Sequence, residues 1–414
     1  MSVTQDNTCT SVDMNKSTAR AEPEGNQPIS LDTLPPELFL CICDYLDAKF
    51  VIKTLSLVCK AFHSTISDDS TWKIRIGKRW PKRYPVIPVD DSNFNWKNAC
   101  IQREEQHRLW SNWKENMDHF VFREGLYAPV DVVHLMKGSQ LLASGSRDRY
   151  LNLLDLNKLD PDNPNSAKDV RIWNVMNAHK GWIWSMSSFD DTLLTGSWDT
   201  YLSLWDLAGG GVPKSRIKCK SAVLCIKTFD EQVTAGGYDN KVYTIDPRVG
   251  IMAEKRYHKK PVLCMAVDQD YVITGSEDQT IVVYDKRAGS VCKTISLEES
   301  YAMSMSYGLG QLWVGSKAGV VHLFDAREGR FELEETYDIG HSGKVTGVHH
   351  SLGSIMTCST DRSIKILQPT RDPDTITTLD VHDLDVAGID FQNNVLASAS
   401  CDVSIGIWKE KVNT

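Results

Sequence analysis

Residues 193–207, with the sequence LLTGSWDTYLSLWDL, contain the pattern that decides the fold of this chain. Two apolar runs flank a short polar turn centred on Asp199. This arrangement predicts a β-hairpin, because strands rich in apolar residues alternate with turns of small and polar ones. The stretch holds two tryptophans: Trp198 lies in the turn and Trp205 near the end of the second run. We expect the two indoles to serve different purposes.

The same pattern recurs six more times along the chain, and it predicts a repeat fold. The turn aspartates of the copies are Asp148, Asp199, Asp239, Asp278, Asp361 and Asp402, with Ala318 at the equivalent place in the fifth copy. A period of about 40 to 45 residues with strand-like units and a Trp-Asp signature is typical of a WD40 β-propeller, which has four strands in each blade. The sequence resembles that family over residues 118–410. We therefore predict a mainly β protein with a seven-bladed propeller.

The last repeat is too short to complete its blade. Strands are expected near residues 386–391, 395–400 and 403–408, and only six residues follow. An open ring would expose unpaired strand edges. We expect residues 119–125, HFVFREG, to supply the missing strand and close the ring. Residues 157–169 are rich in Pro, Asn and Asp and predict a long exposed loop in the first blade.

The WD40 resemblance implies a buried hydrogen-bonded set of four side chains in the best-preserved copies. In these copies a histidine lies four residues before the first β-branched residue of the inner strand. The implied sets are His179, Ser197, Asp199 and Trp205 in one copy, and His382, Ser400, Asp402 and Trp408 in another. His, Ser and Asp also form catalytic triads. Since the same residues recur from blade to blade, whereas an enzyme needs one site, we interpret them as structural.

A second module precedes the propeller. Residues 1–29 are polar and predict a disordered tail. In residues 30–77 the pattern Leu-Pro-x-Glu-Leu, an apolar stripe, Leu-x-x-Val-Cys-Lys-x-Phe and then Trp72 resembles the F-box, with Cys43 where that family more often has a larger aliphatic residue. F-boxes dock on the adaptor subunit of SCF ubiquitin ligases. The resemblance assigns the adaptor contact to Leu34, Pro35, Leu38, Ile42, Leu46, Leu55, Val58 and Cys59. The alternative is that these residues pack a small helical domain of their own.

Residues 78–117 are expected to link the two modules. Lys and Arg are frequent between residues 73 and 83, which predicts either a nucleic-acid contact or, in so acidic a chain, a solvated face. Residues 95–113 predict a helix that joins the F-box to the propeller. We expect this link to be rigid, because a receptor must hold its cargo at a set distance from the ligase.

The composition excludes several classes of function. The net charge of -8 argues against nucleic-acid binding, which needs a positive surface. No apolar stretch is long enough to span a membrane, and the N-terminus has no secretory signal, so a cytoplasmic or nuclear location is expected. The 11 cysteines have no spacing typical of a metal site and are expected as thiols, with no cofactor.

F-box and WD40 modules together resemble the SCF substrate receptors, which implies a non-catalytic subunit whose propeller binds a target protein. Partners would be the SCF adaptor and, through it, cullin and RING subunits; the alternative is a scaffold outside ubiquitination. The target face is expected next to the turns and the entries to the inner strands, at Arg147, Trp182, Trp184, Trp198, Tyr238, Lys260, Glu277, Tyr301, Lys317 and Lys344. The main candidates to bind a phosphate are Arg147, Arg149 and Arg362, and Trp198, Tyr238 and Glu277 lie between them, so we predict an aromatic face of mixed charge and no dedicated phosphate pocket.

Overall fold

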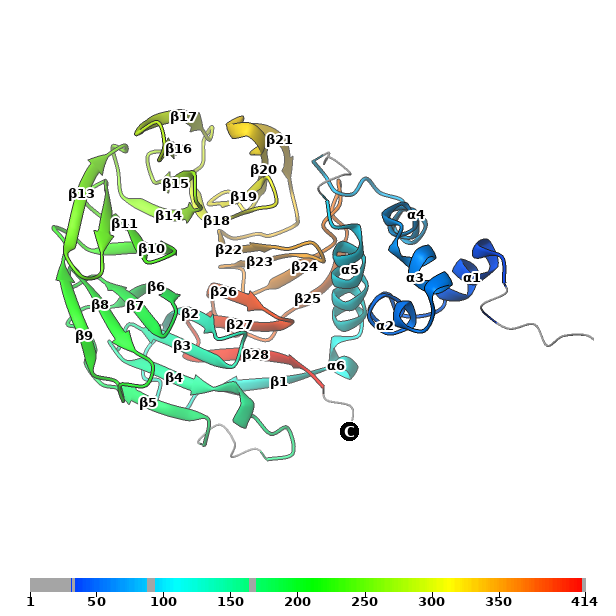
Figure 1. Ribbon diagram of the computed structural model, residues 1–414. Helices are drawn as coiled ribbons and strands as arrows, with labels where there is room; N and C mark the ends of the chain where they lie inside the picture. The colour runs from blue at the N-terminus through cyan, green and yellow to red at the C-terminus, as the bar shows by residue number, and fades with distance from the viewer. Residues whose placement is uncertain (1–30, 32–33, 88–93, 164–168, 412–414) are drawn as a thin grey trace, which may run out of the picture. The chain divides into compact units, whose positions relative to one another are not determined.

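The computed structural model describes residues 31, 34–87, 94–163 and 169–411. These residues divide into two units, with the boundary between Ser67 and Asp68. The smaller unit consists of short helices. The larger one holds the propeller and three helices that precede it (Figure 1).

The small unit forms its helices from local signals. Its elements are α1 (Pro36–Cys43), α2 (Ala48–Lys53), the 3₁₀ helix η2 (Leu55–Leu57) and α3 (Lys60–Ser67). Pro36 starts α1 where its missing N–H costs nothing. Asp47 caps α2 by accepting hydrogen bonds from two backbone N–H groups. The sequence also predicts an apolar stripe at Val51, Leu55, Val58 and Phe62, and the structure divides this stretch among α2, η2 and α3.

Seven four-stranded antiparallel sheets make up the propeller, which confirms the predicted fold class (Figure 1). From the inner to the outer strand, blades 1 to 3 are β2 (Val130–Met136), β3 (Leu141–Ser146), β4 (Leu151–Asp155) and β5 (Arg171–Val175); β6 (Ile183–Phe189), β7 (Thr192–Ser197), β8 (Tyr201–Asp206) and β9 (Pro213–Lys218); β10 (Val223–Phe229), β11 (Gln232–Gly237), β12 (Lys241–Asp246) and β13 (Gly250–Arg256). Blades 4 and 5 are β14 (Val262–Val267), β15 (Tyr271–Ser276), β16 (Thr280–Asp285) and β17 (Ser290–Ser296); β18 (Ala302–Gly308), β19 (Gln311–Ser316), β20 (Val321–Asp325) and β21 (Glu332–Tyr337). Blades 6 and 7 are β22 (Val345–His350), β23 (Ile355–Ser359), β24 (Ile364–Leu367) and β25 (Thr375–Leu379); β26 (Val386–Gln392), β27 (Val395–Ser400), β28 (Ser404–Glu410) and β1 (Met117–Phe122).

The ring closes where the short last repeat predicts it. Strand β1 pairs antiparallel with β28, from Met117 opposite Glu410 to Phe122 opposite Ile405, and so supplies the fourth strand of blade 7. In Figure 1 the cyan strand β1 lies beside the red strand β28. In the first blade, the described part of residues 157–169 connects β4 to β5, and it contains the end of the 3₁₀ helix η3 (Leu156–Lys158). Residues 164–168 of that predicted loop lie outside the described residues.

Three helices lead into the propeller: α4 (Asp69–Arg79), α5 (Trp96–Ser111) and α6 (Trp113–Asn116). Helix α5 confirms the predicted helix over residues 95–113 and packs against β25 of blade 6 (Figure 1). Its Leu109 and Trp110 are fully buried in the core that blades 6 and 7 share. Helix α4, which we expect within the F-box, belongs to the larger unit, because Glu104 of α5 holds Arg75 through two hydrogen bonds of 2.7 and 2.9 Å.

Candidate functional site

The core of the small helical unit lies on one side of α1 and α3. The rings of Phe39 and Phe62 stack with centroids 4.2 Å apart. Cys43 is buried in this unit as well, one helical turn after Phe39. The position at which the sequence departs from the F-box pattern is therefore a packing position, and not part of the expected adaptor contact.

The predicted adaptor-binding residues lie mostly on the outside of this unit. Leu38 and Ile42, one turn apart on α1, keep 54% and 43% of their surface exposed, and Val58 keeps 65%. Pro35 is also exposed, whereas four are partly exposed: Leu34, Leu46, Leu55 and Cys59. Exposed apolar side chains in such number are typical of a protein-interaction site.

Sequence reasoning missed part of the apolar surface of this unit. Phe50 and Leu57 are large, exposed and absent from the predicted set, and so is Tyr45. The residues follow no single helical period, because the chain changes helix after α1 and again after α2. The sequence signal for these exposed residues is a periodic apolar stripe, and such a stripe does not continue past the end of a helix.

In blade 2 the hydroxyl at the centre of the buried set belongs to Thr195, so the prediction of Ser197 was wrong. His179 Nε2 lies 2.7 Å from Thr195 Oγ1, and the indole N–H of Trp205 donates to the same oxygen at 2.8 Å. His179 Nδ1 lies 3.0 Å from the carboxylate of Asp199. Ser197, at the end of β7, reaches only the turn, where its Oγ accepts the backbone N–H of Asp199.

Blade 7 requires the same correction and one more. His382 Nε2 lies 2.7 Å from Ser398 Oγ, whereas Ser400 Oγ accepts the backbone N–H of Asp402. Trp408 is outside the hydrogen-bonded set. Its indole stacks on the His119 ring of β1 at a centroid distance of 4.6 Å, and no described residue accepts its N–H.

The same geometry holds in blades 4 and 6, which identifies the sequence signal. His258 pairs with Thr274 and His341 with Thr357, at 2.9 Å each. In the four blades the hydroxyl lies four residues before the turn aspartate, at Thr195, Thr274, Thr357 and Ser398. The set recurs in four blades, and this repetition favours a structural role over a single catalytic site.

Electrostatics agree with that role. Burial alone would raise the pKa of Asp199, but the hydrogen bond and charge of His179 and two backbone N–H groups outweigh it and lower the pKa to about 2. Burial lowers the pKa of His258 and His341, although their aspartate partners oppose the change. Asp199 thus stays ionised, while the buried rings of His258 and His341 resist protonation.

Half of the predicted target-binding residues come together in one aromatic patch over blades 1 to 3. We define the aromatic patch as Arg147, Trp182, Trp184, Trp198 and Tyr238. The ring of Trp198 lies at its centre, with centroid distances of 6.1, 5.9 and 5.6 Å to the two other indoles and the phenol ring of Tyr238. The guanidinium of Arg147 lies 5.1 Å from the ring of Trp182.

The other five predicted residues, Lys260, Glu277, Tyr301, Lys317 and Lys344, belong to blades 4 to 6 and form no such cluster. The ammonium of Lys317 lies 5.1 Å from the ring centre of Tyr301. Among the residues that the structure describes, no carboxylate forms an ion pair with the exposed Lys260, Lys317 or Lys344.

Of the three arginines that could bind a phosphate, Arg147 is already bound by a carboxylate. The guanidinium of Arg147 donates to both carboxylate oxygens of Asp131 at 3.0 to 3.1 Å. These bonds are the largest reason that the pKa of Arg147 is raised. A guanidinium held by a carboxylate is not free to take a phosphate, which leaves only Arg149 and Arg362 in the exposed turns.

One triad-like set that the sequence did not reveal lies at the inner strands. His134 Nδ1 is 3.0 Å from Asp390 and its Nε2 is 2.9 Å from Ser188 Oγ, while the N–H of Leu135 donates to Asp390 at 2.8 Å. The order of the bonds is that of a catalytic triad. Each member comes from a different blade, however, so the set joins blades 7, 1 and 2 across the ring closure. We assign it to the closure.

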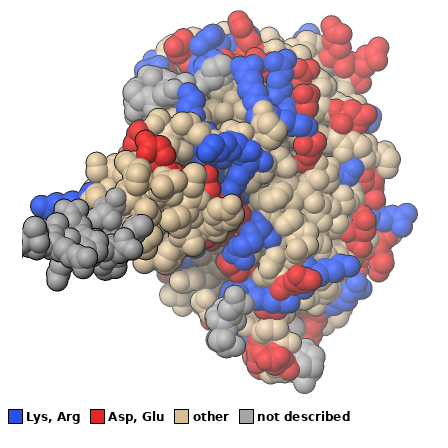
Figure 2. Space-filling model, turned by 90° about the vertical axis from the view of Figure 1, so that its right-hand side faces the viewer, with Lys and Arg blue, Asp and Glu red and all other residues tan. Residues whose placement is uncertain are grey.

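The sequence suggests that the basic stretch between residues 73 and 83 is a solvated face. The structure shows that several of its charges are paired instead. Arg75 is buried, and both it and Arg79 contact Glu104 at 2.7 to 2.8 Å. Lys82 pairs with Asp374 at 2.6 Å. Figure 2 shows Lys and Arg groups interrupted by Asp and Glu on the side that it presents.

Two features are absent from the residues that the structure describes. Within these ranges no group of three or more His, Cys, Asp or Glu side chains is placed to hold a metal ion. No helix in the described part of the chain is both long and apolar enough to cross a membrane.

Comparison with known proteins gives the family. The F-box-like family matches residues 31–75, and the WD domain, G-beta repeat family matches residues 169–206, 253–285 and 332–367. F-box/WD repeat-containing protein 9 of Bos taurus is 39% identical over 380 residues, which cover 91% of this chain and 82% of the relative. The protein of the same name from Homo sapiens is 38% identical over 406 residues, with 95% and 88% covered.

A solved structure supports the fold alone. The WD40 β-propeller domain of Doa1 superposes with a TM-score of 0.60 at 19% identity, over 71% of this chain and 98% of that domain. The identity and coverage of the two curated relatives decide the assignment. The chain belongs to the family of F-box/WD repeat-containing proteins.

Proposed function

We propose that this chain is the substrate-recognition subunit of an SCF-type ubiquitin ligase. The observation that carries the proposal is the exposed apolar surface around Leu38, Ile42 and Val58, in the region that matches the F-box-like family. This surface would bind the SCF adaptor and, through it, the cullin and RING subunits. The chain itself would catalyse nothing and would bring the target to the ligase.

The aromatic patch is the proposed centre of target binding. Trp182, Trp198 and Tyr238 each expose more than a third of their surface, although large aromatic side chains are usually more deeply buried. Trp, Tyr and Arg dominate the binding energy of protein interfaces. Trp198 and Trp205 thereby separate in role, since the second indole is fully buried and hydrogen-bonded to Thr195.

The adaptor proposal predicts the effect of a charge on α1. Changing Ile42→Asp should abolish co-purification of the SCF adaptor, because a buried carboxylate without a partner is costly in an interface. Ile172→Asp is the matched control, since Ile172 on β5 is 44% exposed, against 43% for Ile42. It should leave the adaptor bound. The measurement is the ratio of adaptor to chain after tandem affinity purification.

The second candidate function is a propeller scaffold that acts outside ubiquitination, which the WD40 fold would equally support. It predicts no adaptor with the wild-type chain or with any variant. Adaptor that co-purifies equally with wild type and with Ile42→Asp would also contradict the proposed surface. The target itself would be identified by proximity labelling, in which the proteins labelled by the wild-type chain are compared with those labelled by a chain that lacks residues 30–67.

A further inference from the structure

A repeated irregularity of the inner strands builds the mouth of the central channel. In every blade the pairing of the innermost strand with its neighbour shifts by one residue near the start of the strand. The residues passed over are Asp131, Trp184, Leu224, Leu263, Met303, Thr346 and Ala387, which we call the bulge ring. A β-bulge turns a side chain away from its regular direction.

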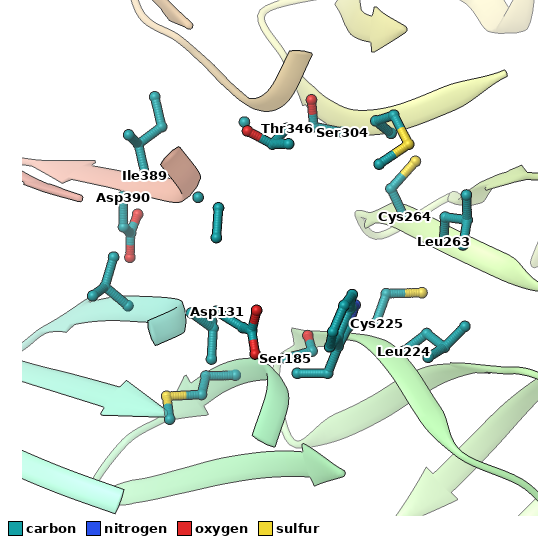
Figure 3. Close-up of a pocket in the computed structure, with 18 of the residues that line it drawn as sticks. Asp131, Ser185, Leu224, Cys225, Leu263, Cys264, Ser304, Thr346, Ile389 and Asp390 are labelled. Carbon is teal, nitrogen blue, oxygen red and sulfur yellow. The ribbon is translucent and has the colours of Figure 1, made fainter. Parts of the chain in front are cut away.

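All seven residues of the bulge ring line one cavity of about 510 Å³ at the axis of the propeller. Figure 3 shows Asp131, Leu224, Leu263 and Thr346 around this space, each on a different blade. A concave space of this size is ordinary for a ligand pocket. Trp184 and Arg147 belong both to the aromatic patch and to the cavity lining, so the patch and the cavity are continuous.

The bulge ring is bulky and apolar on one side, whereas the other side holds Thr346, Ala387 and Asp131. Blades 2 to 5 contribute four bulky apolar side chains in succession: Trp184, Leu263 and Met303, which are partly exposed, and Leu224, which is buried. On the remaining blades the polar members already have partners. The hydroxyl of Thr346 donates to the carbonyl of Val386 at 2.6 Å, and Asp131 is held by Arg147. The apolar arc of blades 2 to 5 is thus the part of the mouth that is suited to an apolar group.

Positive charge borders this arc. Lys260, Lys317 and Lys344 stand exposed on blades 4, 5 and 6, and Lys344 also lines the cavity. Glu277 is the acidic residue of the predicted target face on blade 4, and the aspartates that line the cavity, Asp131, Asp385 and Asp390, belong to blades 1 and 7, outside the arc. Unpaired lysines beside an apolar pocket favour a partner with carboxylates next to an apolar group, because complementary charge steers and orients binding.

We infer that the channel mouth reads a linear acidic segment of a target protein. One bulky apolar side chain of that segment, such as Leu, Met or Phe, enters the apolar arc. Neighbouring Asp or Glu side chains lie over Lys260, Lys317 and Lys344. The inference rests on the proposed function, for which it names the class of target segment.

The test begins with the full-length chain immobilised and a phage library of random 12-residue peptides. The expected consensus is one bulky apolar residue flanked by Asp or Glu. A fluorescent peptide of that consensus should then bind the Met303→Glu variant at least about 10-fold more weakly than wild type, because a carboxylate occupies the arc and repels the acidic segment. Met252→Glu is the matched control, since Met252 lies exposed on the outer strand β13, and it should bind within about 2-fold of wild type.

Two further variants keep the inference falsifiable. Met303→Ala should bind more weakly than wild type and melt at nearly the same temperature, which excludes loss of the fold as the cause. The double variant Lys317→Glu, Lys344→Glu should bind the acidic peptide more weakly than wild type. The affinity of this variant should also depend less on salt concentration. A basic consensus, no consensus, or equal affinity for Met303→Glu and wild type would each overturn the inference.

Adaptor co-purification is followed in the same preparations. Adaptor that stays bound to Met303→Glu while the peptide affinity is unchanged rejects the channel mouth and leaves the proposed function intact. If Met303→Glu destroys peptide binding but the chain never carries the adaptor, the ligase role is rejected. The inference that the channel mouth binds an acidic segment then still stands.

Discussion

At the scale of the single residue, Thr195 carries more stability than its neighbour Ser197. Its hydroxyl serves two buried partners, His179 Nε2 and the Trp205 N–H, whereas the Ser197 hydroxyl accepts one backbone N–H. Thr195→Val should therefore lower the free energy of unfolding by about 3 kcal/mol and Ser197→Ala by about 1 kcal/mol, since each unsatisfied buried polar group costs about 1 to 3 kcal/mol. Urea denaturation followed by tryptophan fluorescence measures both. An equal loss in the two variants, or a larger one for Ser197→Ala, would return the central role to Ser197.

The sequence predicts the residue types of this set but not its connections. Both hydroxyls lie on β7 two residues apart, so both face the same side of the sheet. Which of them meets the histidine depends on how far the loop before β6 reaches along the blade. That distance comes from packing against the neighbouring blade, and no local pattern records it. Trp408 shows the same limit, because its ring partner His119 arrives from the other end of the propeller chain.

At the scale of the element, the turn between the second and third strands imposes one conformation in all seven blades. The residue after each turn aspartate, or after Ala318, has a positive φ: Arg149, Thr200, Asn240, Gln279, Gly319, Arg362 and Val403. This region costs a β-branched residue about 1 to 2 kcal/mol, and Asn less. Thr200→Asn should raise the free energy of unfolding by about 1 kcal/mol, as Asn240 already stands there in blade 3. Val403→Asn should raise the free energy of unfolding by less, because Val403 packs on the core shared by blades 7 and 1 and the substitution loses that packing. A thermal shift series compares them; a lower melting temperature for Thr200→Asn would contradict the strain.

Strands were more predictable than helices for a physical reason. The sequence predicts a strand at residues 395–400, and β27 has these bounds, because turn residues mark both of its ends. In residues 31–76 the apolar residues serve two purposes at once. Some pack the core, such as Phe39 and Phe62, and others stay exposed, such as Leu38 and Val58. A stripe cannot separate these purposes, and it merged α2, η2 and α3.

At the scale of the whole molecule, the bulge ring exists only because the ring closes, since it takes one residue from each of the seven blades. The aromatic patch needs only that blades 1 to 3 lie side by side: Trp198 and Tyr238 are about 40 positions apart in sequence but 5.6 Å apart in ring centroids. The repeat predicts that such a face exists. Which residues lie at the mouth of the channel depends on the β-bulge in each inner strand, and no pattern in the sequence predicts this bulge.

Ring closure also makes the stability of the propeller sensitive to acid. His119 of the closing strand β1 stacks on Trp408, and burial, together with the charge of His382, lowers its pKa from the ordinary 6.5 to about 4. Below pH 6.5 the unfolded chain takes up a proton that the folded chain refuses, so stability is complete above that pH and is lost as the pH falls toward 4. The urea midpoint should therefore decline over this range, and His119→Phe should decline less steeply because it keeps the ring and cannot titrate. His119→Gln should share the shallower slope at a lower overall midpoint, since it loses the stacking. A slope identical to wild type in both variants would place the acid sensitivity in other histidines, such as His350, whose pKa burial lowers to about 3, or His258 and His341.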